Sequence, residues 1–243
     1  PLYLLFYIMN LRRKRLAMKL AYKEELEKEL HEERMRISRE LHDNIGAQMA
    51  IVKRSINFMI EQSDRITPEQ SRSKMIALES ISSQINQELR DTIWAVQNEQ
   101  IDVAGFFTRL KTYVFQLVGP DSPLRVTYSH AGNLNTLLGP FTALNLHRIC
   151  QETINNIIKH AEANEIKIVL VSSTSTLKIT ITDNGKGYDM KNVKEGYGLG
   201  NIRKRAEQIG ATVVFTSSPG SGSSIEIEYT RAPLSTENKR ING

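Results

Sequence analysis

Cysteine is nearly absent from this sequence: Cys150 is the single cysteine among 243 residues. One thiol excludes an internal disulfide and any zinc site built from several cysteines, which suits a reducing cytoplasm. A strong charge of one sign is also lacking. The net charge is +5, and much of the basic excess lies in Arg12-Arg13-Lys14-Arg15. Nucleic-acid binding usually needs a basic stripe on the folded domain, so we expect no direct nucleic-acid partner.

The first ten residues, PLYLLFYIMN, are apolar but too few to cross a bilayer, which takes about 20 apolar residues. The basic cluster that follows them is typical of the cytoplasmic end of a transmembrane helix. We therefore expect a fragment in which residues 1–10 end a transmembrane helix of the cell inner membrane and the rest is cytoplasmic. A surface amphipathic helix or a buried core segment would give the same pattern.

Glycine and proline are missing from residues 17–36, which are rich in Glu, Lys, Leu and Met. This composition favours a helix. Leu20, Leu26 and Leu30 have the loose spacing of a coiled-coil seam, so residues 11–35 are expected to form a signalling coiled coil.

Residues 36–98 are expected to form two helices that are separated at Pro68. Apolar residues recur at steps of three and four in each helix, which predicts an αα-hairpin with one apolar stripe per helix. A single hairpin covers these stripes only in part. Two hairpins would bury them in a four-helix bundle, so we expect a homodimer. The stripes comprise Ile37, Leu41, Ile45, Met49, Val52, Ile56 and Met59 in the first helix, and Leu78, Ile81, Ile85, Leu89 and Val96 in the second.

After a linker at residues 99–103 the pattern changes. Runs such as EIKIVLV and TLKITIT alternate with period two, as half-buried strands do, and helical segments lie between them. Residues 104–231 therefore predict an α/β sandwich, and the polar residues 232–243 predict a flexible tail. The expected fold class is α + α/β, with a dimeric helical hairpin followed by an α/β sandwich.

The segment QETINNIIKHA predicts a helix with one polar face. Glu152, Asn156, Lys159 and His160 share that face by helical spacing, and the opposite face, with Ile154, Ile157 and Ile158, would pack on the sheet. Carboxylate and amide oxygens suit Mg²⁺, and the two basic side chains suit phosphate. A plain amphipathic helix with a solvated face explains the same pattern.

Two glycine-rich segments follow this helix. In DNGKG, Asp183 ends a strand and could accept a hydrogen bond from an exocyclic amine such as that of adenine, while Gly185 and Gly187 let the backbone approach a ligand closely. In GYGLGN, Gly198 and Gly200 precede a helix, whose N-terminus can bind phosphate.

Four segments in this order resemble the N, G1, G2 and G3 boxes of the GHKL (HATPase_c) ATPase superfamily: Glu152 with Asn156, then DNGKG, GYGLGN and SPGSGS. ISRELHDNIG resembles the H-box of the HisKA_3 subfamily of histidine kinases. Together the chain resembles the cytoplasmic part of a two-component sensor histidine kinase, with a HisKA_3 dimerisation and phosphoacceptor domain and a Bergerat-type ATP-binding domain.

The resemblance implies ATP and Mg²⁺ as cofactors and a role for each matching residue. Asn156 would ligate Mg²⁺, and Glu152 would support the metal and water at the phosphates. Asp183 would bind the adenine amine, and residues 188–195 would form a short ATP lid. Around the phosphates and pocket walls it implies Lys159, His160, Gly185, Gly187, Gly198, Gly200 and Ser223.

The pair His42-Asp43 fits the chemistry of phosphoryl transfer. A neutral imidazole can attack through one ring nitrogen while a carboxylate holds the proton on the other. His42 would be the nucleophile and Asp43 its orienting base. The remaining histidines His31, His130 and His147 lack this setting and are expected at the surface, and Cys150 in the core.

We therefore predict a protein-histidine kinase that autophosphorylates His42 and passes the phosphoryl group to an aspartate of a response regulator. The resemblance implies a LuxR-type regulator as partner. The alternatives are a catalytically silent dimeric scaffold and a GHKL ATPase without kinase activity. One departure from the subfamily concerns phosphatase activity: its Gln or His four residues beyond the acidic residue is replaced by Ala47, and Gln48 comes one position later.

Overall fold

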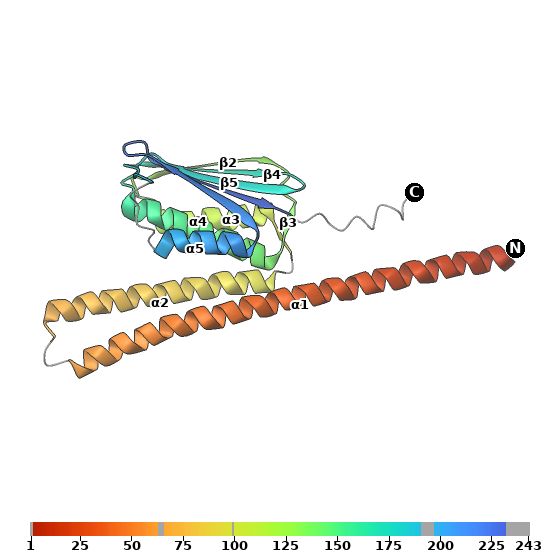
Figure 1. Cartoon of the computed structure of the whole chain (residues 1–243), viewed down its shortest axis with the longest axis horizontal. Helices are drawn as coiled ribbons and strands as arrows, with labels where there is room; N and C mark the ends of the chain where they lie inside the picture. Colours follow the sequence, from red (N-terminus) through yellow and green to blue (C-terminus); the bar gives the residue numbers. More distant parts are fainter. Residues whose placement is uncertain (1, 63–65, 99, 191–196, 232–243) are drawn as a thin grey trace. The chain divides into compact units, whose positions relative to one another are not determined.

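The computed structural model of the chain describes residues 2–62, 66–98, 100–190 and 197–231. It divides into two units, Pro1–Glu99 and Gln100–Gly243, and each is described separately below. Figure 1 shows the helical first unit in red to yellow and the mixed second unit in green to blue.

The first unit is a helical hairpin. Helix α1 spans Leu2–Glu61 without interruption, a length of about 90 Å at 1.5 Å per residue. Helix α2 spans Pro68–Gln97 and begins with a capping box, in which Thr67 Oγ1 accepts a hydrogen bond from the backbone of Gln70. Pro68 therefore begins a helix, because its missing N–H is not needed at the first helical position.

Helices α1 and α2 pack along part of the predicted stripes: Ile37 and Ile85 are 1% and 9% exposed, whereas Met49 and Ile56 of the first stripe are 53% and 43% exposed. The packing leaves much apolar surface open, because a single hairpin offers each helix only one neighbour. Exposed apolar side chains of the paired region include Met49, Ile51, Ile56, Phe58, Ile60, Met75, Ile76 and Ile93.

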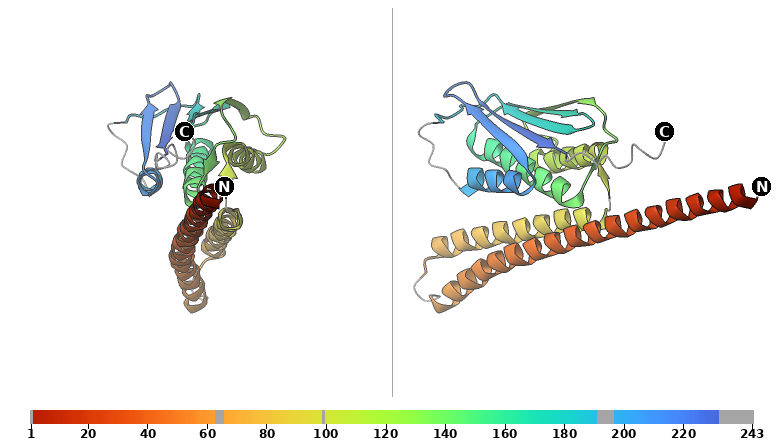
Figure 2. Two further views of the ribbon diagram at one scale, coloured as in Figure 1. Left: turned by 90° about the vertical axis from the view of Figure 1, so that its right-hand side faces the viewer. Right: turned by 45° about the vertical axis from the view of Figure 1, so that its right-hand side comes forward.

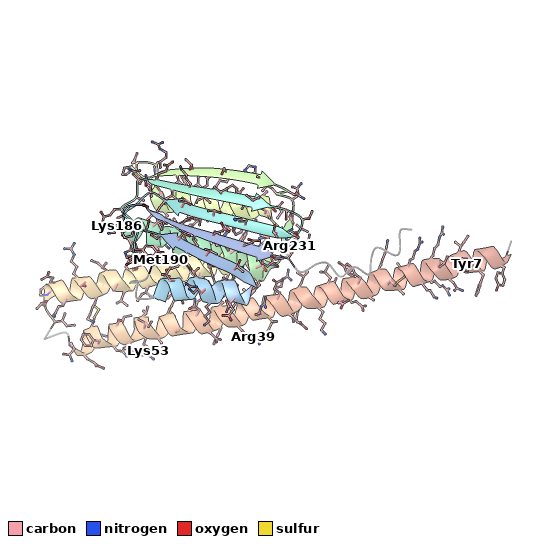
Figure 3. All side chains as sticks on the ribbon, turned by 45° about the horizontal axis from the view of Figure 1, so that its top comes forward. Tyr7, Arg39, Lys53, Lys186, Met190 and Arg231 are labelled. Carbon is pink, nitrogen blue, oxygen red and sulfur yellow. The ribbon has the colours of Figure 1, made fainter. Side chains whose placement is uncertain are left out.

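The N-terminal half of α1 runs beyond α2, and its side chains project outward around the helix, as Tyr7 does in Figure 3. Leu16 and Leu20 are more than half exposed there. Of the helices that the structure describes, none is both long and apolar enough to span a membrane.

The second unit contains three helices and seven strands among its described residues. In chain order they are β1 Ile101–Asp102, α3 Val103–Val118, β2 Arg125–Gly132, β3 Leu137–Leu138, α4 Pro140–His160, β4 Glu165–Ser172, β5 Thr176–Asp183, α5 Tyr197–Gln208, β6 Ala211–Ser217 and β7 Ser223–Thr230.

Five strands form one sheet in the order β2-β4-β5-β7-β6, in which only β2 and β4 are parallel. The three helices lie on one face of this sheet, as both views of Figure 2 show. Alternate residues of β4 and β5 point to the helices and are buried, including Ile168 and Ile179. The prediction of a helical region followed by an α/β sandwich is confirmed.

Three details differ from the sequence prediction. His147 is fully buried rather than at the surface, because it lies on the wall of α4 that packs between the rings of Phe106 and Tyr113. Ile158 is 40% exposed and so does not pack on the sheet, unlike its neighbour Ile157. In place of a linker, Ile101–Asp102 pair with Leu137–Leu138 and belong to the second unit.

Candidate functional site

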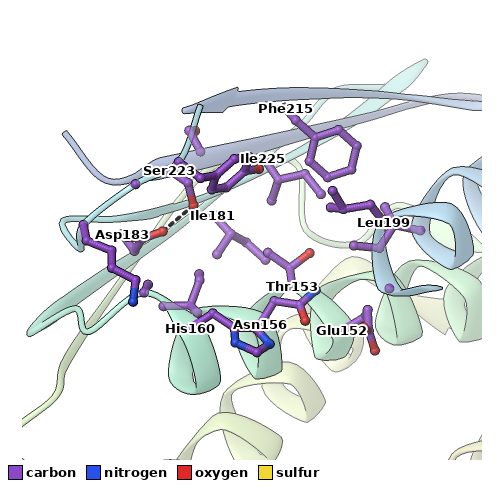
Figure 4. Close-up of a pocket in the computed structure, with 18 residues that line it drawn as sticks. Glu152, Thr153, Asn156, His160, Ile181, Asp183, Leu199, Phe215, Ser223 and Ile225 are labelled. Atoms are coloured by element: carbon purple, nitrogen blue, oxygen red, sulfur yellow. Dashed lines mark hydrogen bonds between the residues drawn. The ribbon is translucent and has the colours of Figure 1, made fainter. Parts of the chain in front are cut away.

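A cavity of about 510 Å³ lies in the second unit between the sheet, α4 and α5, the size range of ligand sites. Figure 4 shows its polar side chains on α4 and at the ends of β5 and β7. The lining residues are Glu152, Thr153, Asn156, Ile157, His160, Ala161, Ile181, Asp183, Lys186, Gly187, Tyr188, Gly198, Leu199, Ile202, Phe215, Ser223, Ser224 and Ile225.

Helix α4 supplies the polar side chains of one wall. Glu152, Asn156 and His160 follow one another at intervals of four residues, so all three reach the cavity from one helix face. The preceding turns of α4 are buried in the core, which fixes the orientation of this face. Lys159 was expected beside them, but it is exposed and is not among the lining residues.

Asp183 provides the carboxylate at the other end of the cavity. It continues the inward alternation of Leu177, Ile179 and Ile181 along β5, and it is only 3% exposed. Its Oδ1 accepts a hydrogen bond of 2.7 Å from the backbone N–H of Gly185, and its Oδ2 accepts one from the hydroxyl of Ser223. The cross-strand register of β5 and β7 places Ser223 directly opposite Asp183.

Two glycines of the first glycine-rich segment permit tight packing around the cavity. Gly187 has a positive φ of 60°, and a Cβ there would lie 2.1 Å from the carbonyl oxygen of Ser218. Gly185 does not line the cavity, but a Cβ on it would lie 2.2 Å from the carbonyl oxygen of Ala161. Gly185 thus lets the chain after β5 approach the end of α4.

The second glycine-rich segment lies at the start of α5. Helix α5 begins at Tyr197, so Gly198 and Gly200 lie in its first turn rather than before it. A Cβ on Gly198 would lie 2.4 Å from Oε1 of Glu152 and 3.3 Å from Nδ2 of Asn156. Gly200 has open space around its Cα and is not a lining residue. Most of the expected lid, residues 188–195, lies outside the described residues.

Several lining residues were not anticipated from the sequence. Lys186 lies between the glycines of the first segment, and its place in that motif was the signal that could have found it, whereas Tyr188 was expected only as the first residue of the lid. Burial and, to a smaller extent, the charge of Asp183 raise the pKa of Tyr188. Phe215 of β6 lines the cavity. Its inward position could be derived from the alternation of side chains along a strand.

The first unit presents the pair His42-Asp43 on α1. The imidazole and carboxylate are 90% and 86% exposed, and Nδ1 of His42 lies 3.6 Å from Oδ1 of Asp43. The carboxylate thus faces Nδ1 rather than Nε2 of the exposed imidazole.

The neighbouring polar residues of α1 point instead toward α2. Asn44 Nδ2 donates to Glu88 Oε2 at 2.5 Å, and Gln48 Nε2 donates to Glu88 Oε1 at 3.0 Å. The side chain of Gln48 is therefore bound inside the hairpin rather than beside His42.

Comparison with known proteins identifies both units. Residues 33–101 match the family described as histidine kinase, and residues 142–233 match the histidine kinase-, DNA gyrase B- and HSP90-like ATPases. The chain is 31% identical over 211 residues to sensor histidine kinase YxjM of Bacillus subtilis, an alignment covering 86% of this chain and 49% of the relative. This chain belongs to the two-component sensor histidine kinases.

Other relatives of this sensor histidine kinase agree with that assignment. Sensor histidine kinase LiaS of Bacillus subtilis is 26% identical over 215 residues, which cover 88% of this chain and 57% of LiaS. The chain thus spans about half the length of these curated relatives. The Acinetobacter baumannii histidine kinase AdeS has a similar fold, with a TM-score of 0.51 and 16% identity over 78% of this chain and 97% of that one.

The pocket of this histidine kinase suits ATP with a divalent cation. No group of three or more His, Cys, Asp and Glu side chains in the described ranges could hold a metal alone. Glu152 and Asn156, however, meet beside Gly198. One carboxylate and one amide are the kind of donor set with which Mg²⁺ binds protein and substrate phosphates together.

Proposed function

We propose that this chain is an ATP-dependent protein-histidine kinase that phosphorylates itself on His42 and then phosphorylates an aspartate of a response regulator. The observation that carries the proposal is the presence, in one chain, of a nucleotide-sized cavity with Asp183 and Asn156 at separate walls and of an exposed histidine beside a carboxylate.

In the proposed complex the adenine lies near Asp183, whose carboxylate accepts a hydrogen bond from the exocyclic amine, and Ser223 orients that carboxylate. The phosphates lie toward the N-terminus of α5, where free backbone N–H groups favour anions. Gly198 and Gly200 border the triphosphate there, with His160 and Lys159 on the side of α4.

Asn156 and Glu152 would hold Mg²⁺ against the phosphates, and the bound cation would neutralise charge that develops on the transferring group. Glu152 also orients water at the phosphates. Gly185 and Gly187 shape the pocket by letting the chain approach closely behind Asp183.

At the acceptor, Nε2 of His42 attacks the γ-phosphorus of ATP. The new N–P bond forms as the bond to the β–γ bridging oxygen breaks, and ADP leaves. Asp43 lies on the Nδ1 side of the ring, so it holds the Nδ1 proton and stabilises the positive charge of the phosphorylated imidazole. The phosphoryl group then passes to an aspartate carboxylate, which regenerates His42.

A second copy of this chain is the proposed partner of the hairpin. The exposed apolar side chains of α1 and α2 would be covered in a four-helix bundle formed by two hairpins at residues 36–98. Residues 11–35 would continue the dimer as a coiled coil, since Leu16 and Leu20 are exposed in the single chain. Residues 1–10 would attach the kinase to the inner membrane, and the response regulator would be of the LuxR type.

The proposal is tested by following labelled phosphate from γ-labelled ATP with Mg²⁺. A kinase keeps the label covalently on the protein and passes it to a response regulator receiver domain. Label released only as inorganic phosphate would indicate a GHKL ATPase without kinase activity. ATP binding with neither retention nor release would indicate a silent dimeric scaffold.

A further inference from the structure

A polar contact between the two helices lies next to the phosphoacceptor but has no place in the chemistry above. Glu88 on α2 accepts hydrogen bonds from two side chains of α1, Asn44 at 2.5 Å and Gln48 at 3.0 Å. All three side chains are half-buried. Each oxygen of the Glu88 carboxylate takes one donor, so the three residues form a clamp with defined geometry.

The clamp lies on the side of α1 opposite the phosphoacceptor. Asn44 and Gln48 are one helical turn apart, and both face α2. At 100° per residue, His42 lies about 140° around the helix axis from the midpoint of Asn44 and Gln48, and Asp43 lies about 120° from it in the other direction. Any rotation of α1 that breaks the clamp therefore moves His42 by the same angle.

Apolar packing alone restrains the rotation of α1 about its axis only weakly. Around the clamp α1 carries apolar side chains on several faces, and Met49 and Ile51 are each about half exposed. Neighbouring apolar faces can exchange at small cost, whereas hydrogen bonds to a carboxylate are directional and costly to leave unmade in a half-buried site. A polar contact in an apolar helix interface can fix register for this reason.

We infer that Glu88 is a positioning residue, which sets the rotation of α1 through Asn44 and Gln48 and so keeps His42 and Asp43 exposed. The catalytic consequence rests on the proposed kinase function. The orientation of α1 does not rest on that function, and it can be measured without ATP.

Two changes separate the clamp from general stability. Glu88→Leu keeps a similar volume and removes both acceptors. Glu88→Gln can keep both bonds, because its amide accepts from Asn44 and donates to Gln48 once the Gln48 amide turns over. Glu79→Leu is the matched control on α2, since Glu79 is exposed and accepts a hydrogen bond from Ser83 of its own helix. A double variant, Asn44→Ala with Gln48→Ala, removes the same bonds from the side of α1.

The first measurement is the rate of label transfer to the whole chain as a function of ATP concentration. Glu88→Leu and the double variant should transfer label about tenfold more slowly at saturating ATP with an unchanged KM. Glu88→Gln and Glu79→Leu should transfer label at the unsubstituted rate.

The second measurement uses a nitroxide at Ala47→Cys without nucleotide, since Ala47 is exposed and Cys150 is buried. Rotation of α1 in Glu88→Leu or the double variant should lower the nitroxide's accessibility to a water-soluble relaxing agent, and Glu88→Gln should not. If Glu88→Leu does not fold, the double variant supplies both readouts.

An unchanged nitroxide in the clamp variants would overturn the inference, and so would a full transfer rate. Slow transfer in Glu88→Gln equal to that in Glu88→Leu would also overturn it, because the clamp survives in Glu88→Gln. If the unsubstituted chain itself takes no label, the proposed function and the catalytic consequence fail. The accessibility of the nitroxide then still tests whether Glu88 sets the orientation of α1.

Discussion

Asp183 and Asn184 are adjacent in the sequence and serve opposite sides of the chain. Asp183 faces the cavity, where its Oδ2 accepts from Ser223. Asn184 turns away: its Oδ1 accepts from the backbone N–H groups of Asn164 and Glu165 at 3.1 and 2.9 Å, and its Nδ2 donates to Asn164 at 2.7 Å. One residue of the pair is placed to bind a ligand, and the other fastens the end of β5 to the start of β4.

Substitutions of these neighbours should therefore separate binding from stability. Asn184→Ala should lower the free energy of unfolding by about 0.5–1.5 kcal/mol, because exposed hydrogen bonds to two backbone donors are lost, and change ATP affinity little. Asp183→Asn should weaken ATP binding about tenfold or more, because an acceptor for the adenine amine becomes a donor. Urea unfolding and ATP titration calorimetry measure the two effects. Loss of ATP affinity in Asn184→Ala without loss of stability would contradict this division.

Two adjacent asparagines of α4, Asn155 and Asn156, provide a test of cation binding. Asn156 lines the cavity and Asn155 does not. Asn156→Ala should weaken MgATP binding about tenfold or more, since an amide oxygen that would bind the cation is lost. Asn155→Ala is the matched control. Titrations with ATP in Mg²⁺ and in EDTA measure the effect, and an equal loss of affinity in both conditions would exclude a role for Asn156 at the cation.

The close approach of Gly198 to Glu152 predicts an effect of one added methyl group. The Cβ of Gly198→Ala would lie 2.4 Å from Oε1 of Glu152, so the flexible carboxylate must shift from its position. We expect a melting temperature close to that of the unsubstituted chain, because alanine favours the helix, and slower label transfer. Asn201→Ala on the same helix is the control. Normal transfer by Gly198→Ala would show that the position of Glu152 is unimportant.

Cys150 should be unreactive in the folded chain. Burial raises the pKa of its thiol to about 12 from an ordinary value of 9.0, so at pH 8 it is protonated as well as enclosed. Between these two values the unfolded chain loses the proton and the folded chain keeps it, so this group's contribution to stability falls as pH rises. Mass spectrometry after maleimide treatment at pH 8 should find no modification without urea and full modification in urea. Rapid modification of the native chain would contradict a buried position.

The elements of the second unit could be predicted from the sequence because their patterns are local. Alternation along EIKIVLV and TLKITIT fixes both the strands and the inward direction of Asp183. Spacing of four residues places Glu152, Asn156 and His160 together, since one helix presents all three. For residues such as these, helical and strand periodicity determine which side chains share a face.

The parts that could not be predicted depend on contacts between distant residues. His147 is buried because α3 brings Phe106 and Tyr113 against it, and no local pattern contains that information. Ile158 stays 40% exposed although Ile154, one turn earlier in α4, is buried, and the local pattern does not distinguish the two residues. The clamp joins Asn44 and Glu88 across 44 residues, and neither residue stands out in its own segment.

The identity of the phosphoacceptor is tested most directly by radiolabel transfer from γ-labelled ATP with Mg²⁺ to the unsubstituted chain and to His42→Ala. Phosphohistidine is labile in acid and stable in alkali, in contrast to phosphoserine. We predict an acid-labile, alkali-stable label on the unsubstituted chain and none on His42→Ala, with ATP affinity equal in the two proteins. A label that persists in His42→Ala, or that survives acid, would contradict the assignment of His42 as the nucleophile.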